Sequence, residues 1–137
     1  PHIIAPSEII TDPNLTFNRT SDIAIAQLNC FNKQLVMESI LTESTYTILL
    51  LQEPWVNLYT LKIPSYPAWH ELMPYDYQAQ TYQDKICTCI YISKRIPSWQ
   101  IALLPSKSPL LTAVELTFPQ GKFSQIQLLS VYNPPRH

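Results

Sequence analysis

The sequence predicts an α/β fold with a mixed β-sheet that starts with a β-α-β unit. Three observations predict it: an apolar run at residues 22–28, a segment with helical spacing after it, and a second apolar run at 47–52. Continuous apolar runs of this length are typical of strands buried on both faces. From Ile86 onward the chain shows strand-like segments without helices. The 137 residues, 46% of them hydrophobic, are enough for one domain with a core.

The first unit of this fold is the β-α-β segment. Asp22 to Leu28 (DIAIAQL) forms the first predicted strand, and Thr47 to Gln52 (TILLLQ) forms the second. Asn32 is the predicted N-cap of a helix that runs to about Glu43. We expect the crossover to be right-handed and the two strands to be parallel. The apolar stripe of the helix comprises Val36, Met37, Ile40 and Leu41.

The later strands are separated by prolines and end in a predicted hairpin near Gln120-Gly121. We interpret the three tryptophans as core or interface aromatics, and the three cysteines as small buried apolar side chains. The single glycine excludes a glycine-rich phosphate loop. The predicted strands are Trp69–Met73, Ile86–Ser93, Trp99–Leu104, Leu111–Phe118 and Phe123–Tyr132.

Residues 1–21 are rich in Pro, Ser, Thr and Asn, so we expect a flexible leader there and one domain over 22–137. The net charge of −1 provides no general attraction for nucleic acid, so any phosphate chemistry depends on a metal or a local patch. No apolar run is long enough to span a bilayer, and we expect no membrane partner.

Polar residues follow the two parallel strands. Asn29 and Glu53 lie just past the carboxyl ends of these strands, where ligands bind in open α/β sheets. Simpler interpretations stay open: Asn29 suits a turn, Glu53 a surface position, and Tyr132 a packed strand end.

Three segments resemble motifs of one enzyme superfamily. They are Gln27-Leu28-Asn29-Cys30, Leu50-Leu51-Gln52-Glu53-Pro54-Trp55 and Val131-Tyr132-Asn133-Pro134-Pro135, and Ile90 to Ile96 is a weaker match. In order and spacing they resemble the endonuclease/exonuclease/phosphatase superfamily, closest to the N-terminal part of the endonuclease domain of fungal LINE-type retrotransposons. The resemblance implies half of a four-layered, DNase I-like α/β sandwich.

The resemblance also implies roles for individual residues. Glu53 would be the metal-binding glutamate, and Asn29 would help to hold the metal and the scissile phosphate. Tyr132 would lie near that phosphate, and Asn133 belongs to the same motif without an assigned role. The implied cofactor is Mg²⁺, which prefers carboxylate and amide oxygens and neutralises charge on a reacting phosphate. The implied substrate is DNA, and the implied compartment is intracellular, the nucleus.

The sequence departs from this superfamily in its later motifs. No Gly-Asp-Phe-Asn-like segment and no Ser-Asp-His-like end is present. We therefore expect a missing C-terminal half and little or no nuclease activity, because general acid–base assistance is worth about 10²–10⁴-fold. We also expect one sheet with an uncovered inner face. The alternative function is a non-catalytic interaction module that uses this open face to bind a protein or its own copy.

Overall fold

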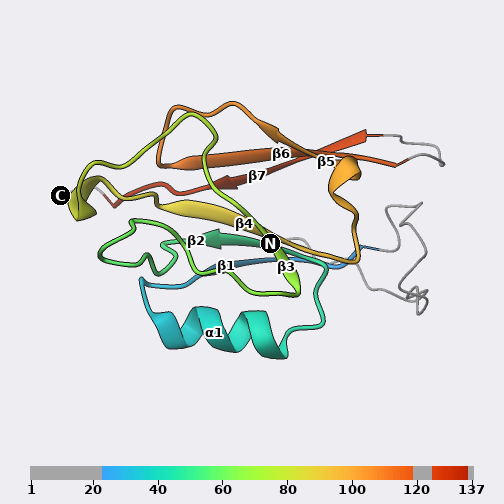
Figure 1. Cartoon of the computed structure of the whole chain (residues 1–137), viewed down its shortest axis with the longest axis horizontal. Helices are drawn as coiled ribbons and strands as arrows, with labels where there is room; N and C mark the ends of the chain where they lie inside the picture. The colour runs from blue at the N-terminus through green and yellow to red at the C-terminus, as the bar shows by residue number, and fades with distance from the viewer. Residues whose placement is uncertain (1–22, 119–124, 136–137) are drawn as a thin grey trace.

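Residues 23–118 and 125–135, which the computed structural model describes, form two β-sheets and one α-helix (Figure 1). The mixed α/β class predicted from the sequence is confirmed. Helix α1 spans Gln34–Glu43, and two short 3₁₀ helices, η2 and η3, span Tyr82–Asp84 and Ser98–Gln100. In spatial order, the four-stranded sheet contains β1 (Ile25–Asn29), β2 (Ile48–Gln52), β4 (Thr88–Ser93) and β3 (Trp69–Leu72). The three-stranded sheet contains β5 (Ile101–Leu104), β6 (Leu111–Thr117) and β7 (Gln125–Val131).

The β-α-β unit has the predicted arrangement. β1 and β2 are parallel, in a register that pairs Ile25 with Ile48 and Asn29 with Gln52. Helix α1 ends at Glu43, as expected, and its apolar stripe packs on the sheet. The predicted N-cap is wrong, because the cap is Lys33. Asn32 has a φ of 57°, in the left-handed region, whereas an N-cap takes an extended conformation.

The second sheet covers the inner face of the first, so the prediction of a single sheet with an uncovered face is wrong. Strands β5, β6 and β7 pair with one another instead of extending the first sheet. Alternate residues of β6 then form an apolar face that has to be buried. Figure 1 shows the two sheets one above the other. The shared core contains Ile23, Ile25, Ile48, Leu50, Ile90, Ile92, Ile96, Val114, Leu116 and Phe118.

A second core lies on the other face of the four-stranded sheet, under α1. Met37 and Leu41 of α1 are buried there, and the indole Nε1 of Trp69 donates a hydrogen bond to the Leu41 carbonyl at 2.9 Å. Trp55 is partly buried against this core. Trp99 is 62% exposed in η3, so it is not a core residue. Helix η3 also delays the start of β5 to Ile101.

Two predictions made from the sequence concern residues outside the described ranges. These are the leader at 1–21 and the hairpin turn at Gln120-Gly121, although the flanking strands β6 and β7 are antiparallel neighbours. Across the described ranges, no helix has the length and apolar character needed to cross a bilayer. All three cysteines have free thiols; Cys30 and Cys89 are buried as predicted, whereas Cys87 is only half-buried.

Candidate functional site

The turn after β1 is hydrogen-bonded to the end of β2. The amide of Cys30 donates to the Gln52 carbonyl at 2.8 Å, and the amide of Asn32 donates to the Glu53 carbonyl at 2.8 Å. The side-chain oxygen of Asn29 accepts from the amide of Phe31 at 2.8 Å, which closes a tight turn. These bonds keep the two strand ends side by side at one rim of the sheet.

Glu53 has a strained backbone at this rim. Its φ of 48° lies in the left-handed region, which typically costs a non-glycine residue about 1–3 kcal/mol. The bond from its amide to the Cys87 carbonyl, 2.9 Å long, helps to hold this conformation. Outliers of this kind concentrate at functional sites. Phe31, Asn32 and Leu61 have the same left-handed conformation, so the strain is compatible with a functional role for Glu53 but does not single it out.

Tyr132 contacts Glu53 from the second sheet. Its hydroxyl donates to Oε1 of Glu53 at 2.5 Å, across 79 residues of sequence. The Tyr132 amide is fixed by a 3.0 Å bond to the Leu110 carbonyl. The hydrogen bond to Glu53, then burial and the nearby charges of Glu53 and Cys87, raise the pKa of the Tyr132 phenol. Tyr132 is therefore a protonated donor at neutral pH.

The two predicted asparagines lie beside this pair. Asn29 is half-buried at the end of β1, opposite Gln52. Within residues 23–118 and 125–135, no hydrogen bond joins the side chains of Asn29 and Glu53. Asn133 is exposed and directly follows Tyr132. The structure thus brings Glu53 and Tyr132 into contact and places Asn29 on the neighbouring strand, while the roles of these residues stay predictions.

The donor atoms at this rim have the chemistry that magnesium requires. Glu53 supplies a half-buried carboxylate, of which Tyr132 occupies one oxygen, and the amide oxygen of Asn29 retains a second lone pair. The part of the chain that the structure describes contains no group of three or more His, Cys, Asp or Glu suited to a metal. Magnesium does not need such a group, because it commonly uses one or two carboxylates together with waters and substrate phosphate.

A buried polar cluster beneath the rim was not predicted from the sequence. Nε2 of Gln52 donates to Oγ of Ser130 at 3.0 Å, and the hydroxyls of Thr88 and Thr112 lie 2.9 Å apart. Gln52 pairs with Thr88 in the first sheet, and Thr112 pairs with Ser130 in the second. We call these four residues the inter-sheet polar cluster. Its only sequence signal is the polar residue type at inward positions of apolar strands.

His70 lies at the other end of the molecule from Glu53. It pairs with Ile92 near the end of β4, whereas Glu53 bonds to Cys87 just before β4 begins. Its Nε2 lies 2.8 Å from the carbonyl of Ile96. His70 is therefore too far from Glu53 to act as its general base.

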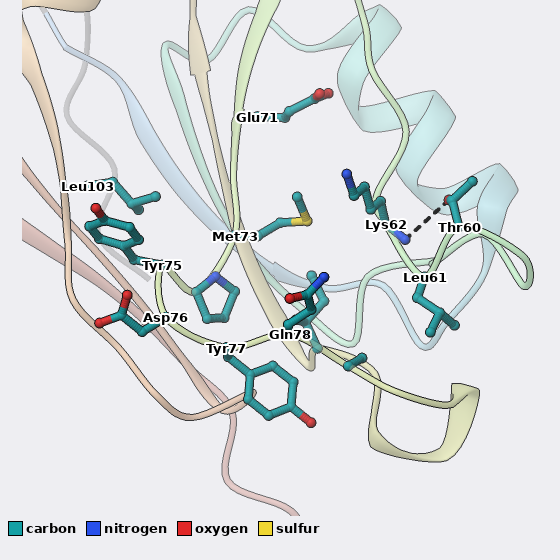
Figure 2. A pocket seen from close by; sticks show the side chains of 13 residues that line it. Thr60, Leu61, Lys62, Glu71, Met73, Tyr75, Asp76, Tyr77, Gln78 and Leu103 are labelled. Carbon is teal, nitrogen blue, oxygen red and sulfur yellow. Dashed lines mark hydrogen bonds between the residues drawn. The ribbon is translucent and has the colours of Figure 1, made fainter.

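A cavity of about 490 Å³ lies between the loop after Glu53 and the end of β3 (Figure 2). Ile86, the residue before Cys87, lines this cavity. Figure 2 shows the Lys62 side chain extending toward Glu71. Its charged lining residues are one lysine, Lys62, and two acids, Glu71 and Asp76. This balance opposes a polyanion.

Comparisons of the chain with protein families, with curated proteins and with solved structures found no match.

Proposed function

We propose that the rim formed by Asn29, Glu53 and Tyr132 is the metal-binding and phosphate-binding part of a magnesium-dependent endonuclease that cleaves phosphodiesters, of the LINE retrotransposon type. DNA as substrate and the nucleus as compartment belong to this proposal. The observation that carries it is the 2.5 Å contact between Tyr132 and Glu53. Two motifs far apart in sequence, which the resemblance assigns to one active site, supply these two side chains.

Each residue has a chemically reasonable task in such a site. Glu53 and Asn29 would hold the cation, which, when bound, neutralises the charge that develops on the reacting phosphate. Tyr132 is protonated, and its single O–H, which bonds Glu53 in this structure, could donate to a phosphate oxygen instead once the cation holds the Glu53 carboxylate. The strained backbone of Glu53 is held by neighbouring bonds before any ligand arrives.

These three residues would bind the metal and the phosphate, and none of them would act as a general base. The one histidine among the described residues, His70, lies at the far end of β4. General acid–base assistance contributes about 10²–10⁴-fold to such reactions. We therefore propose that the chain by itself binds the cation but cleaves DNA weakly or not at all.

Paramagnetic Mn²⁺ in place of Mg²⁺ tests this proposal. The nuclear magnetic resonance signals of the Asn29, Glu53 and Tyr132 amides should broaden first as Mn²⁺ is added. Glu53→Gln should abolish the selective broadening. The matched control is Glu43→Gln, an exposed carboxylate at the end of α1, and it should leave the broadening unchanged. Broadening centred elsewhere, or unchanged in Glu53→Gln, contradicts the proposed metal site.

Self-association is a second candidate function, favoured by one observation. On β7, Leu129 is 53% exposed and Val131 is 54% exposed, on the face of the second sheet that points away from the shared core. An exposed apolar patch beside an edge strand is a common interaction surface. Sedimentation over a range of protein concentrations tests this function. A strictly monomeric species removes it, and Leu129→Lys should weaken any dimer that forms.

A further inference from the structure

We propose that Gln52 and Ser130 are positioning residues that hold Glu53 and Tyr132 in contact. Both lie in the inter-sheet polar cluster, and each is close in sequence to one member of the pair. Gln52 directly precedes Glu53, and Ser130 lies two residues before Tyr132. This inference goes beyond the proposed function, because it concerns the geometry of the pair and not the ligand that the pair binds.

The Ser130 hydroxyl joins the two sheets at two points. It accepts a hydrogen bond from Nε2 of Gln52 at 3.0 Å and donates one to the Leu51 carbonyl at 2.9 Å. In sequence, Ser130 lies 78 positions after Gln52 and 79 positions after Leu51, and both hydrogen bonds are buried. Because one bond reaches the side chain and the other the main chain of β2, β7 cannot slide along β2 without breaking both. A buried polar group left without its partner is costly, which favours this single register.

The same register determines where Tyr132 lies. Tyr132 lies one residue past the end of β7, but the bond from its amide to the Leu110 carbonyl continues the pairing with the chain before β6. Because residues two apart in an extended chain share one face, Ser130 and Tyr132 both point toward the first sheet, where they bond Gln52 and Glu53. A slip of one residue would turn both side chains to the opposite face. Two residues of extended chain span only about 7 Å, so once the Ser130 hydroxyl is fixed, the Tyr132 phenol has little freedom to move. The bond from the Tyr132 amide to the Leu110 carbonyl removes more of it.

On the first sheet, Gln52 constrains Glu53 in the same way. Its side chain bonds Ser130, and its carbonyl accepts from the Cys30 amide. The next amide, that of Glu53, is bound to the Cys87 carbonyl. Hydrogen bonds therefore fix the backbone on both sides of the strained Glu53 peptide. They hold the Glu53 carboxylate facing the Tyr132 phenol.

The threonine pair of the cluster provides a matched control. Thr88 and Thr112 form an equally buried inter-sheet hydrogen bond, and they lie beside Gln52 and Ser130 in the two registers. Neither threonine side chain forms a hydrogen bond with the side chain of Gln52 or Ser130, or with the Leu51 carbonyl, within the described ranges. Thr112→Val therefore removes a comparable bond at the same depth and leaves the two bonds of Ser130 in place.

The test is the chemical shift of the tyrosine ζ carbon in the full chain, measured at neutral pH without metal or nucleic acid. Tyr132→Phe assigns the Tyr132 signal, and Glu53→Ala gives its position when the hydrogen bond is absent. Ser130→Ala should move the signal most of the way to the Glu53→Ala position. Gln52→Met, which conserves side-chain volume, should move it in the same direction and serves if Ser130→Ala does not fold.

Two results would overturn the proposal. One is a wild-type Tyr132 signal in either folded variant, Ser130→Ala or Gln52→Met. The other is an equal shift in Thr112→Val, which would show general loosening between the sheets. Because no metal is present, this outcome is independent of the Mn²⁺ experiment. The positioning role and the proposed metal site can therefore fail separately.

Discussion

Packing between the two sheets predicts a large difference between two leucine truncations in the three-stranded sheet. Leu116 on β6 is fully buried in the shared core, whereas Leu129 on β7 is 53% exposed on the outer face. The chemical change, Leu→Ala, is the same at both positions. Any difference in the free energy of unfolding therefore reports the burial of each side chain and not the loss of particular atoms.

The expected sizes follow from burial. Leu116→Ala should lower the free energy of unfolding by about 3 kcal/mol, within the range of about 2–5 for core leucines, because it loses transfer free energy and leaves a cavity. Full burial of a leucine is worth about 1.5–3 kcal/mol, so Leu129→Ala, which loses less than half of that burial, should cost about 1 kcal/mol or less. Against a typical domain stability of about 5–15 kcal/mol, the first loss is large.

Urea unfolding measures both values. The fluorescence of the three tryptophans, of which Trp69 is buried, and the far-ultraviolet circular dichroism should show coincident transitions, which tests the two-state assumption. The shift in midpoint multiplied by the common slope gives each change in free energy. Equal losses for Leu116→Ala and Leu129→Ala would refute the packing of the second sheet onto the first. They would support the uncovered sheet face that the sequence alone predicted.

Three further predictions concern other residues. Burial raises the pKa of the Cys30 thiol to about 12, so Cys30 stays protonated at pH 8. It should therefore react with a thiol reagent much more slowly than the half-buried Cys87. Mass spectrometry of samples taken at successive times measures the two rates. Hydrogen bonds from the backbone and side chain of Thr81 lower the pKa of Asp84, so its stabilising contribution is present above the unfolded-state pKa and is lost as pH falls through the folded-state value. Thr81→Ala removes the hydroxyl donor and keeps the amide donor, so it should raise this pKa in a carboxyl-carbon titration, and an unchanged value would contradict the contribution of the hydroxyl. Trp69→Phe removes a buried indole hydrogen bond to α1 and should destabilise the protein by about 1–3 kcal/mol in urea unfolding, whereas a neutral effect would show that the bond is not formed.

Local pattern was enough to identify most strands and the helix. The apolar run of β2 and the spacing of Met37 and Leu41 depend only on neighbouring residues, and the structure has both as expected. The parallel pairing of β1 and β2 also followed, because a strand–helix–strand connection leaves few alternatives. The N-cap at Asn32 was wrong because its backbone is drawn into the turn by a bond to the Glu53 carbonyl. That bond depends on a residue 21 positions later.

The sequence by itself determined the carboxyl ends of the two parallel strands to within one residue, and so that Asn29 and Glu53 share one rim of a parallel pair. Only the tertiary structure decided that β5–β7 form a separate sheet and that Tyr132 reaches Glu53 across 79 residues. Strand periodicity shows which residues share a face, but it does not show which strand lies beside which. That choice depends on non-local burial and on buried bonds such as that of Gln52 to Ser130, which exist only once the sheets have packed.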